Sequence, residues 1–264
     1  MIKIHYLGTC SGTEPMKDMH HTSTVLEVDG ALYWFDAGEG CAHTAYTMGL
    51  DVMNAEAIFI SHPHIDHIGG MANLLFLFDK LIIRNGLSLA KNNTLLAFLP
   101  NFEIFEAIKL VALSGRIKRD DFKFNLCEKK ISEGVIFEDE RIRVIAKGNE
   151  HIPRPDKDSP YSSFSFLVEV GGKKIIFSGD LKSQAELDVL TDGGADVLIM
   201  ETGHHKVSDV CDYAASHNIK NLRFIHHGRE ILGDRVGAET FVSEYEKRFD
   251  LSIKIARDAT SEEF

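Results

Sequence analysis

One ten-residue segment constrains this chain more than any other. Residues 61–70 read Ser-His-Pro-His-Ile-Asp-His-Ile-Gly-Gly and follow the short apolar run Ala57–Ile60. A short apolar run bounded by polar residues is typical of a buried strand that presents a polar loop at its carboxyl end. The chain holds 13 histidines, more than packing requires, and three of them lie in this loop. The segment therefore predicts a buried strand that delivers a cluster of histidines.

Four side chains of the loop have the types and the spacing of metal ligands. His62 and His64 stand two apart, so on extended backbone they project to the same side, and the turn that follows brings Asp66 and His67 to a neighbouring position. Imidazole and carboxylate suit Zn²⁺, Mn²⁺ or Fe. No cysteine lies in the loop, which disfavours a closed structural zinc site and favours a catalytic one.

Three further candidates follow strands downstream. His151 comes after the strand predicted at 141–146, Asp180 comes after the one at 174–178, and His226 ends the one at 222–225. A carboxylate at position 180 could bridge two ions about 3.5 to 4 Å apart. Alternatives stay open at each position: another residue of the proline-containing loop for His151, a simple turn role for Asp180, and His227 for His226. Together the seven side chains suffice for two ions.

Other polar residues near strand ends have two interpretations each. Asp36 either orients the histidine loop or caps its own loop, and His204 and His205 either donate a proton or touch phosphate, or have a capping or solvent role. Basic clusters are few, and each has two possible roles, contact with a substrate phosphate or simple exposure to solvent. They are Arg116, Lys118 and Arg119, and the pair Lys129 and Lys130.

The order of predicted elements indicates an α/β fold in one domain over residues 1–264. Strands and helices are expected, in chain order, at 2–7, 24–28, 31–35, 57–60, 71–83 (a helix, apolar nearly all round and so buried), 94–98, 101–113 (a helix capped by Asn101), 141–146, 164–170, 174–178, 197–200, 208–217 (a helix), 222–225, 238–249 (a helix) and 253–256. The dipeptides Asp29-Gly30 and Gly171-Gly172 predict two-residue hairpin turns. Two mixed sheets with helices outside satisfy this order.

Composition excludes several classes of function. The 264 residues are 44% hydrophobic, and no apolar run approaches the ~20 residues of a membrane span. The start of the chain does not resemble a secretory signal, so a cytoplasmic protein is expected. The net charge of −11 repels nucleic acid, which makes a long nucleic acid an unfavourable partner.

The motifs taken together resemble the metallo-β-lactamase superfamily. Its members share the H-x-H-x-D-H loop, a later isolated histidine, a Gly-Asp after a strand and a final histidine, in the order found here. The resemblance implies an αββα four-layer sandwich with a dinuclear site. It places His62, His64 and His151 on one ion and Asp66, His67 and His226 on the other, with Asp180 bridging.

Three shorter stretches resemble the ribonuclease Z-like phosphodiesterase branch of that superfamily: LGTCSG near the start, WFDAGEG at 34–40 and IHHGRE near the end. Iron-dependent members that reduce oxygen have Glu in place of His64, and common β-lactamases have Cys in place of Asp180, so the resemblance favours hydrolysis of another substrate. The Gly/Pro-rich arm with which members that process transfer RNA hold their substrate is not evident.

These features predict a dinuclear metal-dependent hydrolase. The expected cofactors are two divalent ions, with Zn²⁺ favoured over Mn²⁺ or Fe, and Asp66 is expected to orient the attacking water or accept its proton. The favoured substrate is a small or nucleotide-like phosphodiester. A hydrolase of carboxylic esters, thioesters or lactones is the alternative, a non-catalytic metal-stabilised binding protein is a third hypothesis, and a homodimer stays open.

Overall fold

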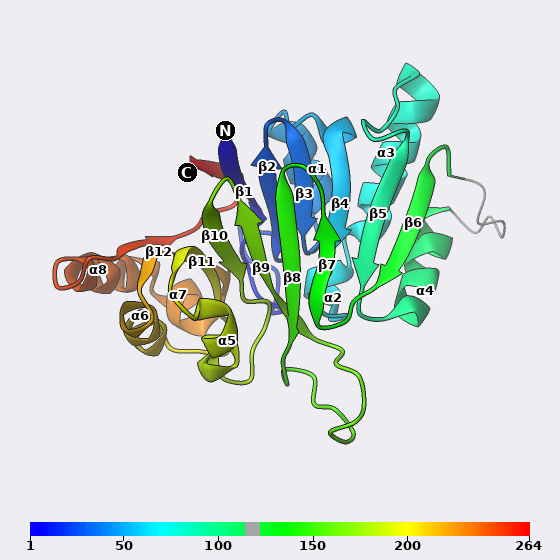
Figure 1. Cartoon of the computed structure of the whole chain (residues 1–264). Helices are drawn as coiled ribbons and strands as arrows, with labels where there is room; N and C mark the ends of the chain where they lie inside the picture. Colours follow the sequence, from blue (N-terminus) through cyan, green and yellow to red (C-terminus); the bar gives the residue numbers. More distant parts are fainter. Residues whose placement is uncertain (114–121) are drawn as a thin grey trace. The chain divides into compact units, whose positions relative to one another are not determined.

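The computed structural model describes residues 1–113 and 122–264. The chain divides into two compact units, Met1–Ile131 together with Arg257–Phe264, and Ser132–Ala256. Among the described residues each unit contains one seven-stranded mixed sheet (Figure 1). The predicted α/β class with two mixed sheets is therefore confirmed, whereas a single domain over residues 1–264 stays a prediction.

The sheet of the first unit has the strand order β14-β1-β2-β3-β4-β5-β6. Strands β14, β1, β2 and β3 pair antiparallel, and β3 to β6 pair parallel. The strands are β1 (Ile2–Gly8), β2 (Ser23–Val28), β3 (Ala31–Phe35), β4 (Ala55–Phe59), β5 (Thr94–Leu99), β6 (Asn125–Lys130) and β14 (Thr260–Glu263). Because parallel neighbours end at the same edge of a sheet, the loops that follow β3 and β4 lie together.

The β2–β3 hairpin turns at the predicted dipeptide. Asp29 and Gly30 both have positive φ, 49° and 85°, as a two-residue type I′ turn requires. This turn sets a register in which Leu26 pairs with Tyr33 and Thr24 with Phe35. The local signal therefore sets the pairing of β2 with β3.

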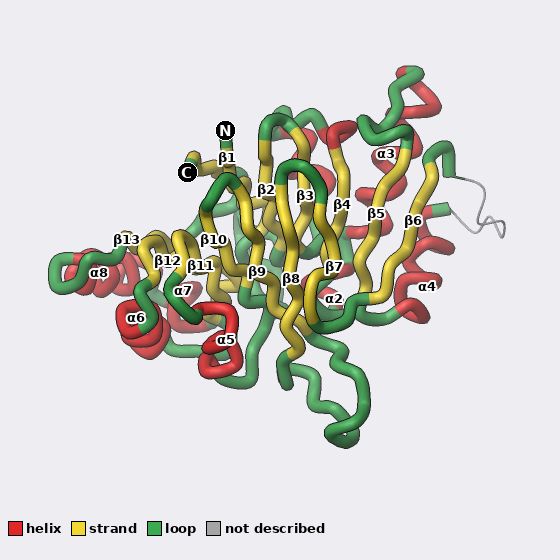
Figure 2. The backbone as a smooth tube through the Cα atoms, in the orientation of Figure 1, coloured by secondary structure: helices red, strands yellow, loops and turns green. Residues whose placement is uncertain are grey.

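Helices of the first unit pack on one face of its sheet (Figure 2). They are α1 (Cys41–Thr47), α2 (Ile65–Ile68), α3 (Met71–Asn85) and α4 (Phe102–Ala112), with a 3₁₀ turn at Val52–Asn54. The rings of Trp34 in β3 and Phe78 in α3 meet edge to face, with centroids 6.3 Å apart. α3 is not buried all round as predicted, because Phe76 and Ile83 are 39% and 50% exposed.

The second unit repeats this arrangement, with the strand order β13-β12-β11-β10-β9-β8-β7. Strands β7 to β10 pair antiparallel and β10 to β13 pair parallel. The strands are β7 (Gly134–Glu138), β8 (Ile142–Gly148), β9 (Phe164–Val170), β10 (Lys173–Phe177), β11 (Ala195–Thr202), β12 (Ile219–His227) and β13 (Ser252–Ile255). The helices are α5 (Asp188–Thr191), α6 (Val207–Ser216), α7 (Arg229–Gly233) and α8 (Arg235–Glu246), preceded by a 3₁₀ turn at Gln184–Leu187.

The parallel strands of the second unit end at one edge of its sheet. Asp180 follows β10, Glu201 and His204 lie at the end of β11, and His226 lies at the end of β12. Strand β8 runs in the same direction as β10, since both pair antiparallel with β9, so the loop that carries His151 leaves from the same edge. None of the helices in the described ranges, 1–113 and 122–264, is long and apolar enough to cross a membrane.

Candidate functional site

Asp36 and the histidine loop form a buried hydrogen-bonded group in the first unit. The Asp36 carboxylate accepts hydrogen bonds from the Ser61 backbone N–H at 2.7 Å and from the Ser61 hydroxyl at 2.8 Å. Its Oδ2 also lies 2.8 Å from Nδ1 of His67. Asp36 therefore both caps the loop and orients a histidine, so both interpretations drawn from the sequence hold.

This contact determines which nitrogen of His67 can bind a metal. An imidazole that donates Nδ1–H to a carboxylate presents the lone pair of Nε2 to an ion. Nε2 of His67 lies 3.5 Å from Oδ2 of Asp66, and both side chains are buried, at 1% and 6% exposure. The two residues thus place a ring nitrogen and a carboxylate oxygen side by side.

His62 and His64 converge as their spacing predicts. Nε2 of His62 lies 3.0 Å from Nδ1 of His64, and their ring centroids are 4.5 Å apart. His64 keeps extended backbone, with φ −64° and ψ 147°, directly before α2 begins at Ile65. The Ser61 hydroxyl lies 3.0 Å from the other nitrogen of His62. The first unit therefore brings its four predicted ligands into one group.

Two glycines make room for Asp66. A methyl group on Gly12 would come 2.8 Å from Oδ2 of Asp66, and one on Gly38 would come 2.4 Å from its backbone oxygen. Such distances are shorter than real contacts permit. Both glycines lie in stretches singled out above, LGTCSG and WFDAGEG, but their types alone indicate no role. Gly12 lies against the carboxylate predicted to be catalytic, and Gly38 lies against the backbone of the same residue.

Asp180 is the centre of the group in the second unit. Its Oδ2 lies 3.3 Å from Nε2 of His226, 3.5 Å from Nε2 of His151 and 3.8 Å from Nδ1 of His204. Ligand atoms of Asp180, His204 and His226 all lie within 4.8 Å of one another. Because Asp180 is 2% exposed, its charge calls for cationic partners. Three imidazoles around one carboxylate oxygen form a donor set that suits a divalent ion.

His226 and His227 have different environments. His226 has φ 49°, an uncommon conformation for a residue other than glycine, at a point where the β11–β12 register shifts. This conformation directs His226 to Asp180, while Nε2 of His227 lies 2.9 Å from the backbone oxygen of Ala256. Burial lowers the pKa of His227 to about 3, so it is a neutral anchor. Of the two histidines, His226 is the one that lies beside Asp180.

Glu201 belongs to this group and was missed from the sequence. Its carboxylate accepts a hydrogen bond from the His204 backbone N–H at 2.9 Å and lies 3.2 Å from Nδ1 of the same residue. The side chain is 1% exposed and also lies 3.3 Å from Nε2 of His205. The available signal was an acidic residue at the end of the apolar run Val197–Met200. A buried carboxylate there orients His204 and lies beside His205.

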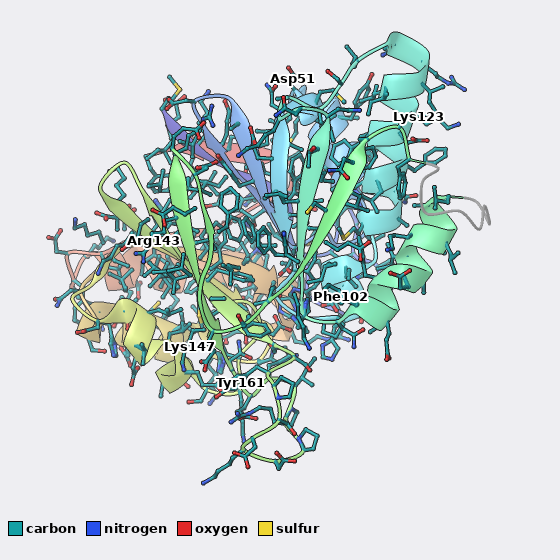
Figure 3. The ribbon with its side chains drawn as sticks, turned by 45° about the vertical axis from the view of Figure 1, so that its right-hand side comes forward. Asp51, Phe102, Lys123, Arg143, Lys147 and Tyr161 are labelled. Atoms are coloured by element: carbon teal, nitrogen blue, oxygen red, sulfur yellow. The ribbon has the colours of Figure 1, made fainter. Side chains whose placement is uncertain are left out.

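The loop that carries His151 is stiffened by its own contacts. It extends from β8 to β9, and Figure 3 shows Tyr161 on it. The Arg154 guanidinium lies 3.8 Å from the centroid of the Tyr161 ring and donates to Glu150, which precedes His151. The predicted basic residues Arg116, Lys118 and Arg119 lie outside the described residues, whereas Lys129 and Lys130 are exposed at the end of β6.

Comparison with known proteins agrees with this fold. A family model described as anti-Pycsar protein Apyc1 matches residues 2–207. The metallo-β-lactamase fold protein YhfI from Bacillus subtilis has a TM-score of 0.70 at 15% identity, covering 99% of this chain and 98% of that one. A diphosphatase from the PhnP family has a TM-score of 0.65 at 16% identity, covering 100% and 98%. The predicted metallo-β-lactamase fold and the resemblance to that superfamily are confirmed.

One curated relative is named as a ribonuclease Z. Ribonuclease Z of Treponema pallidum (strain Nichols) is 44% identical over 72 residues, which are 27% of this chain and 23% of that protein. The chain therefore matches about a quarter of the length of this relative. The relative and the solved neighbour named as a diphosphatase are hydrolases, in agreement with the prediction of an enzyme.

Proposed function

The chain belongs to the family described as anti-Pycsar protein Apyc1, and from this premise we propose that it is a metal-dependent phosphodiesterase acting on a small or nucleotide-like diester. The observation that carries the proposal is a pair of side-chain groups, His62, His64, Asp66 and His67 in one unit and Asp180 with three histidines in the other. Five of these side chains are buried: His62, Asp66, His67, Asp180 and His226. Burial of so many ionisable groups is costly unless they serve a metal or a reaction.

The proposed ligand set has seven residues and holds two divalent ions, with Zn²⁺ favoured by the mixture of imidazole and carboxylate. In this proposal His62, His64 and His151 would hold one ion, Asp66, His67 and His226 would hold the other, and Asp180 would be shared between them. When bound, such a pair lowers the pKa of a coordinated water toward about 7 and neutralises charge that develops on substrate oxygens.

The protein's own residues supply orientation and proton transfer. Asp66 would orient the attacking water and accept its proton, and the contact between Asp36 and His67 would leave Nε2 of His67 available to a metal. His204 is the proposed proton donor to the leaving group. Its side chain is 43% exposed, so substrate can reach it, while Glu201 holds its Nδ1 at 3.2 Å. The opposite ring nitrogen can then carry a proton to substrate.

A small diester is preferred over a long nucleic acid for two reasons. The net charge of −11 opposes binding of a polyanion, which normally depends on many Lys and Arg contacts. One solved neighbour is a diphosphatase by name, and such an enzyme acts on a phosphorus centre. Because curated relatives are named ribonuclease Z, a transfer-RNA precursor is also one of the substrates to be tested.

Kinetics on four substrates test this function. The protein loaded with Zn²⁺ or Mn²⁺ is assayed on bis(p-nitrophenyl) phosphate, a cyclic nucleotide, a transfer-RNA precursor and an acyl lactone. We expect kcat/KM for a small phosphodiester to exceed that for the lactone at least about tenfold, a difference of ~1.4 kcal/mol in barrier. Dominant turnover of a lactone, ester or thioester would establish the alternative hydrolase, and efficient precursor cleavage would show that the acidic charge does not exclude RNA.

A further inference from the structure

The loop between β1 and β2 is closed at its base. It covers residues 9–22 and contains the last four residues of the LGTCSG motif. The Cys10 N–H donates to the His20 carbonyl at 2.9 Å, and the Thr22 hydroxyl donates to the Cys10 carbonyl at 3.2 Å. The two ends of the loop are therefore joined by hydrogen bonds.

A carboxylate from the far end of the chain joins both ends of this loop. Oδ1 of Asp258 accepts hydrogen bonds from the Thr9 N–H at 2.9 Å and from the Thr9 hydroxyl at 2.7 Å. Its Oδ2 accepts the His20 N–H. Asp258 precedes β14, which pairs with β1, and Figure 1 shows the two chain ends side by side. The Asp258 side chain thus accepts three hydrogen bonds from two residues, Thr9 and His20, which lie 249 and 238 positions before it in the sequence.

The acceptor role at Asp258 is demanding. All three donors belong to the loop, so both oxygens of the Asp258 carboxylate have to act as acceptors. Burial raises the pKa of the Asp258 carboxyl, and the bonds from Thr9 and His20 counteract this effect. An amide in the same place has one oxygen and one NH₂ group, so one of its ends would direct a donor at a donor.

The loop held in this way packs against Asp66. Gly12 lies three residues after Thr9, and an added methyl group there would come 2.8 Å from Oδ2 and 3.1 Å from Oδ1 of Asp66. The Gly12 backbone therefore covers the carboxylate and restricts its rotation. Any loosening of the loop widens the space in which the Asp66 side chain can turn.

We infer that Asp258 is a positioning residue for Asp66: it fastens the loop that keeps the Asp66 carboxylate in one orientation. The inference rests on the proposed function, in which Asp66 ligates metal and handles the proton of the attacking water. Asp258 touches neither substrate nor metal in this role. It acts through Thr9, His20 and Gly12.

The test compares Asp258→Asn with Glu263→Gln. Glu263 lies on β14, the strand that Asp258 precedes, and is an exposed partner of Lys3 at 3.3 Å, so its variant controls for effects on β14. In Asp258→Asn we expect hydrogen exchange at the loop amides to accelerate, and zinc transfer to a chromogenic chelator to become at least about threefold faster. On bis(p-nitrophenyl) phosphate kcat should fall about tenfold with KM nearly unchanged, because orientation and not binding is lost. Glu263→Gln should match the parent protein.

Combination with Gly12→Ala examines the pathway. If Asp258 acts through the contact between Gly12 and Asp66, Gly12→Ala and Asp258→Asn affect the same contact. The loss of kcat in the double variant should then be smaller than the product of the two single losses. Thr9→Val, which removes only the hydroxyl donor, should give a smaller effect in the same direction and serves if Asp258→Asn does not fold.

Two results would overturn the inference: unchanged loop exchange in Asp258→Asn, or faster exchange with chelator transfer unaltered. Because both readouts are independent of turnover, they remain informative if the parent protein does not hydrolyse the diester. In that event the proposed function fails, and the structural link between Asp258 and Asp66 is still tested.

Discussion

Gly203 lies directly against the imidazole of His226, so that a methyl group on its Cα would come 2.5 Å from Nδ1 and 2.7 Å from Cε1. Gly203→Ala should therefore displace the His226 ring from Asp180 and weaken metal binding about ten- to a hundredfold. Chelator competition measures this affinity. Gly233→Ala is the matched control, since nothing lies within 4 Å of its added methyl group. Equal affinities for the two variants would show that the ring tolerates the displacement.

Replacement of the two adjacent histidines should have different results. His226→Ala should abolish turnover and lose one metal, because it removes an imidazole that lies 3.3 Å from Asp180. His227→Ala should keep the metal content but lower the free energy of unfolding by about 2 kcal/mol, since it leaves a cavity and deprives the Ala256 carbonyl of a donor. Elemental analysis and urea denaturation measure both effects. Loss of metal in the His227 variant alone would reverse the assignment.

Metal stoichiometry tests the bridging role of Asp180. Protein reconstituted with Zn²⁺ or Mn²⁺ should contain two ions per chain, because three ligands and a water would suffice for one. Asp180→Ala should weaken binding of both ions, whereas His62→Ala should mainly affect one. A stoichiometry of one or less in the reconstituted parent protein would contradict the bridge.

The dependence of rate on the leaving group tests His204 as proton donor. A p-nitrophenolate departs without a proton, while an alkoxide needs one, so a lost general acid affects only poor leaving groups. His204→Gln should lower kcat/KM for an alkyl phosphodiester about a hundredfold and change that for the nitrophenyl ester little. His43→Gln, at an exposed position of α1, is the control. Equal losses on both esters would indicate a binding role for His204.

Asp196 should make stability depend on pH in the acid range. Its carboxylate accepts from Lys220 Nζ at 2.7 Å and from the Lys174 N–H at 2.9 Å. Burial raises the pKa of Asp196, but these partners outweigh burial and lower it below 3.8. The folded state thus binds this proton more weakly than the unfolded state, so the contribution is present above pH 3.8 and is lost as the pH falls through the depressed pKa.

Asp196→Asn should consequently lower the free energy of unfolding by about 1 kcal/mol at pH 7. The difference should become smaller as the pH falls below 3.8. Urea titrations of both proteins at several pH values measure the difference. A difference that stays constant down to the lowest pH would assign the effect to shape instead of charge.

Elements with local signals were predictable from the sequence. The Asp29-Gly30 turn has the positive φ angles that its residue types favour, and Asn101 caps α4 by accepting from the Ile104 N–H at 2.9 Å. Both features depend on neighbours within four residues, so tertiary packing does not have to be known.

Edge strands were not predictable in the same way. β6 (NLCEKK) and β14 (TSEE) bury little on either face, so neither shows the alternation that marks a half-buried strand. They form because β5 and β1 offer unpaired backbone groups. Nothing in their own residues indicates such a partner.

The site residues also differ in whether a local sequence signal predicts them. The histidine loop was readable because its ligands are adjacent in sequence, and the ends of the apolar runs marked Asp180 and His226. The roles of Gly12 and Glu201 depend on contacts with side chains distant in sequence or on burial. Sequence spacing does not encode these contacts.

Strand β14 also has a consequence for the order in which the protein is made. Residues Arg257–Phe264 belong to the first unit, yet the ribosome synthesises them only after the whole of Ser132–Ala256. Until then β1 lacks its outer neighbour and the Thr9 loop lacks Asp258. The nascent chain therefore carries an open sheet edge through most of its synthesis, a state in which pairing with another chain competes with folding.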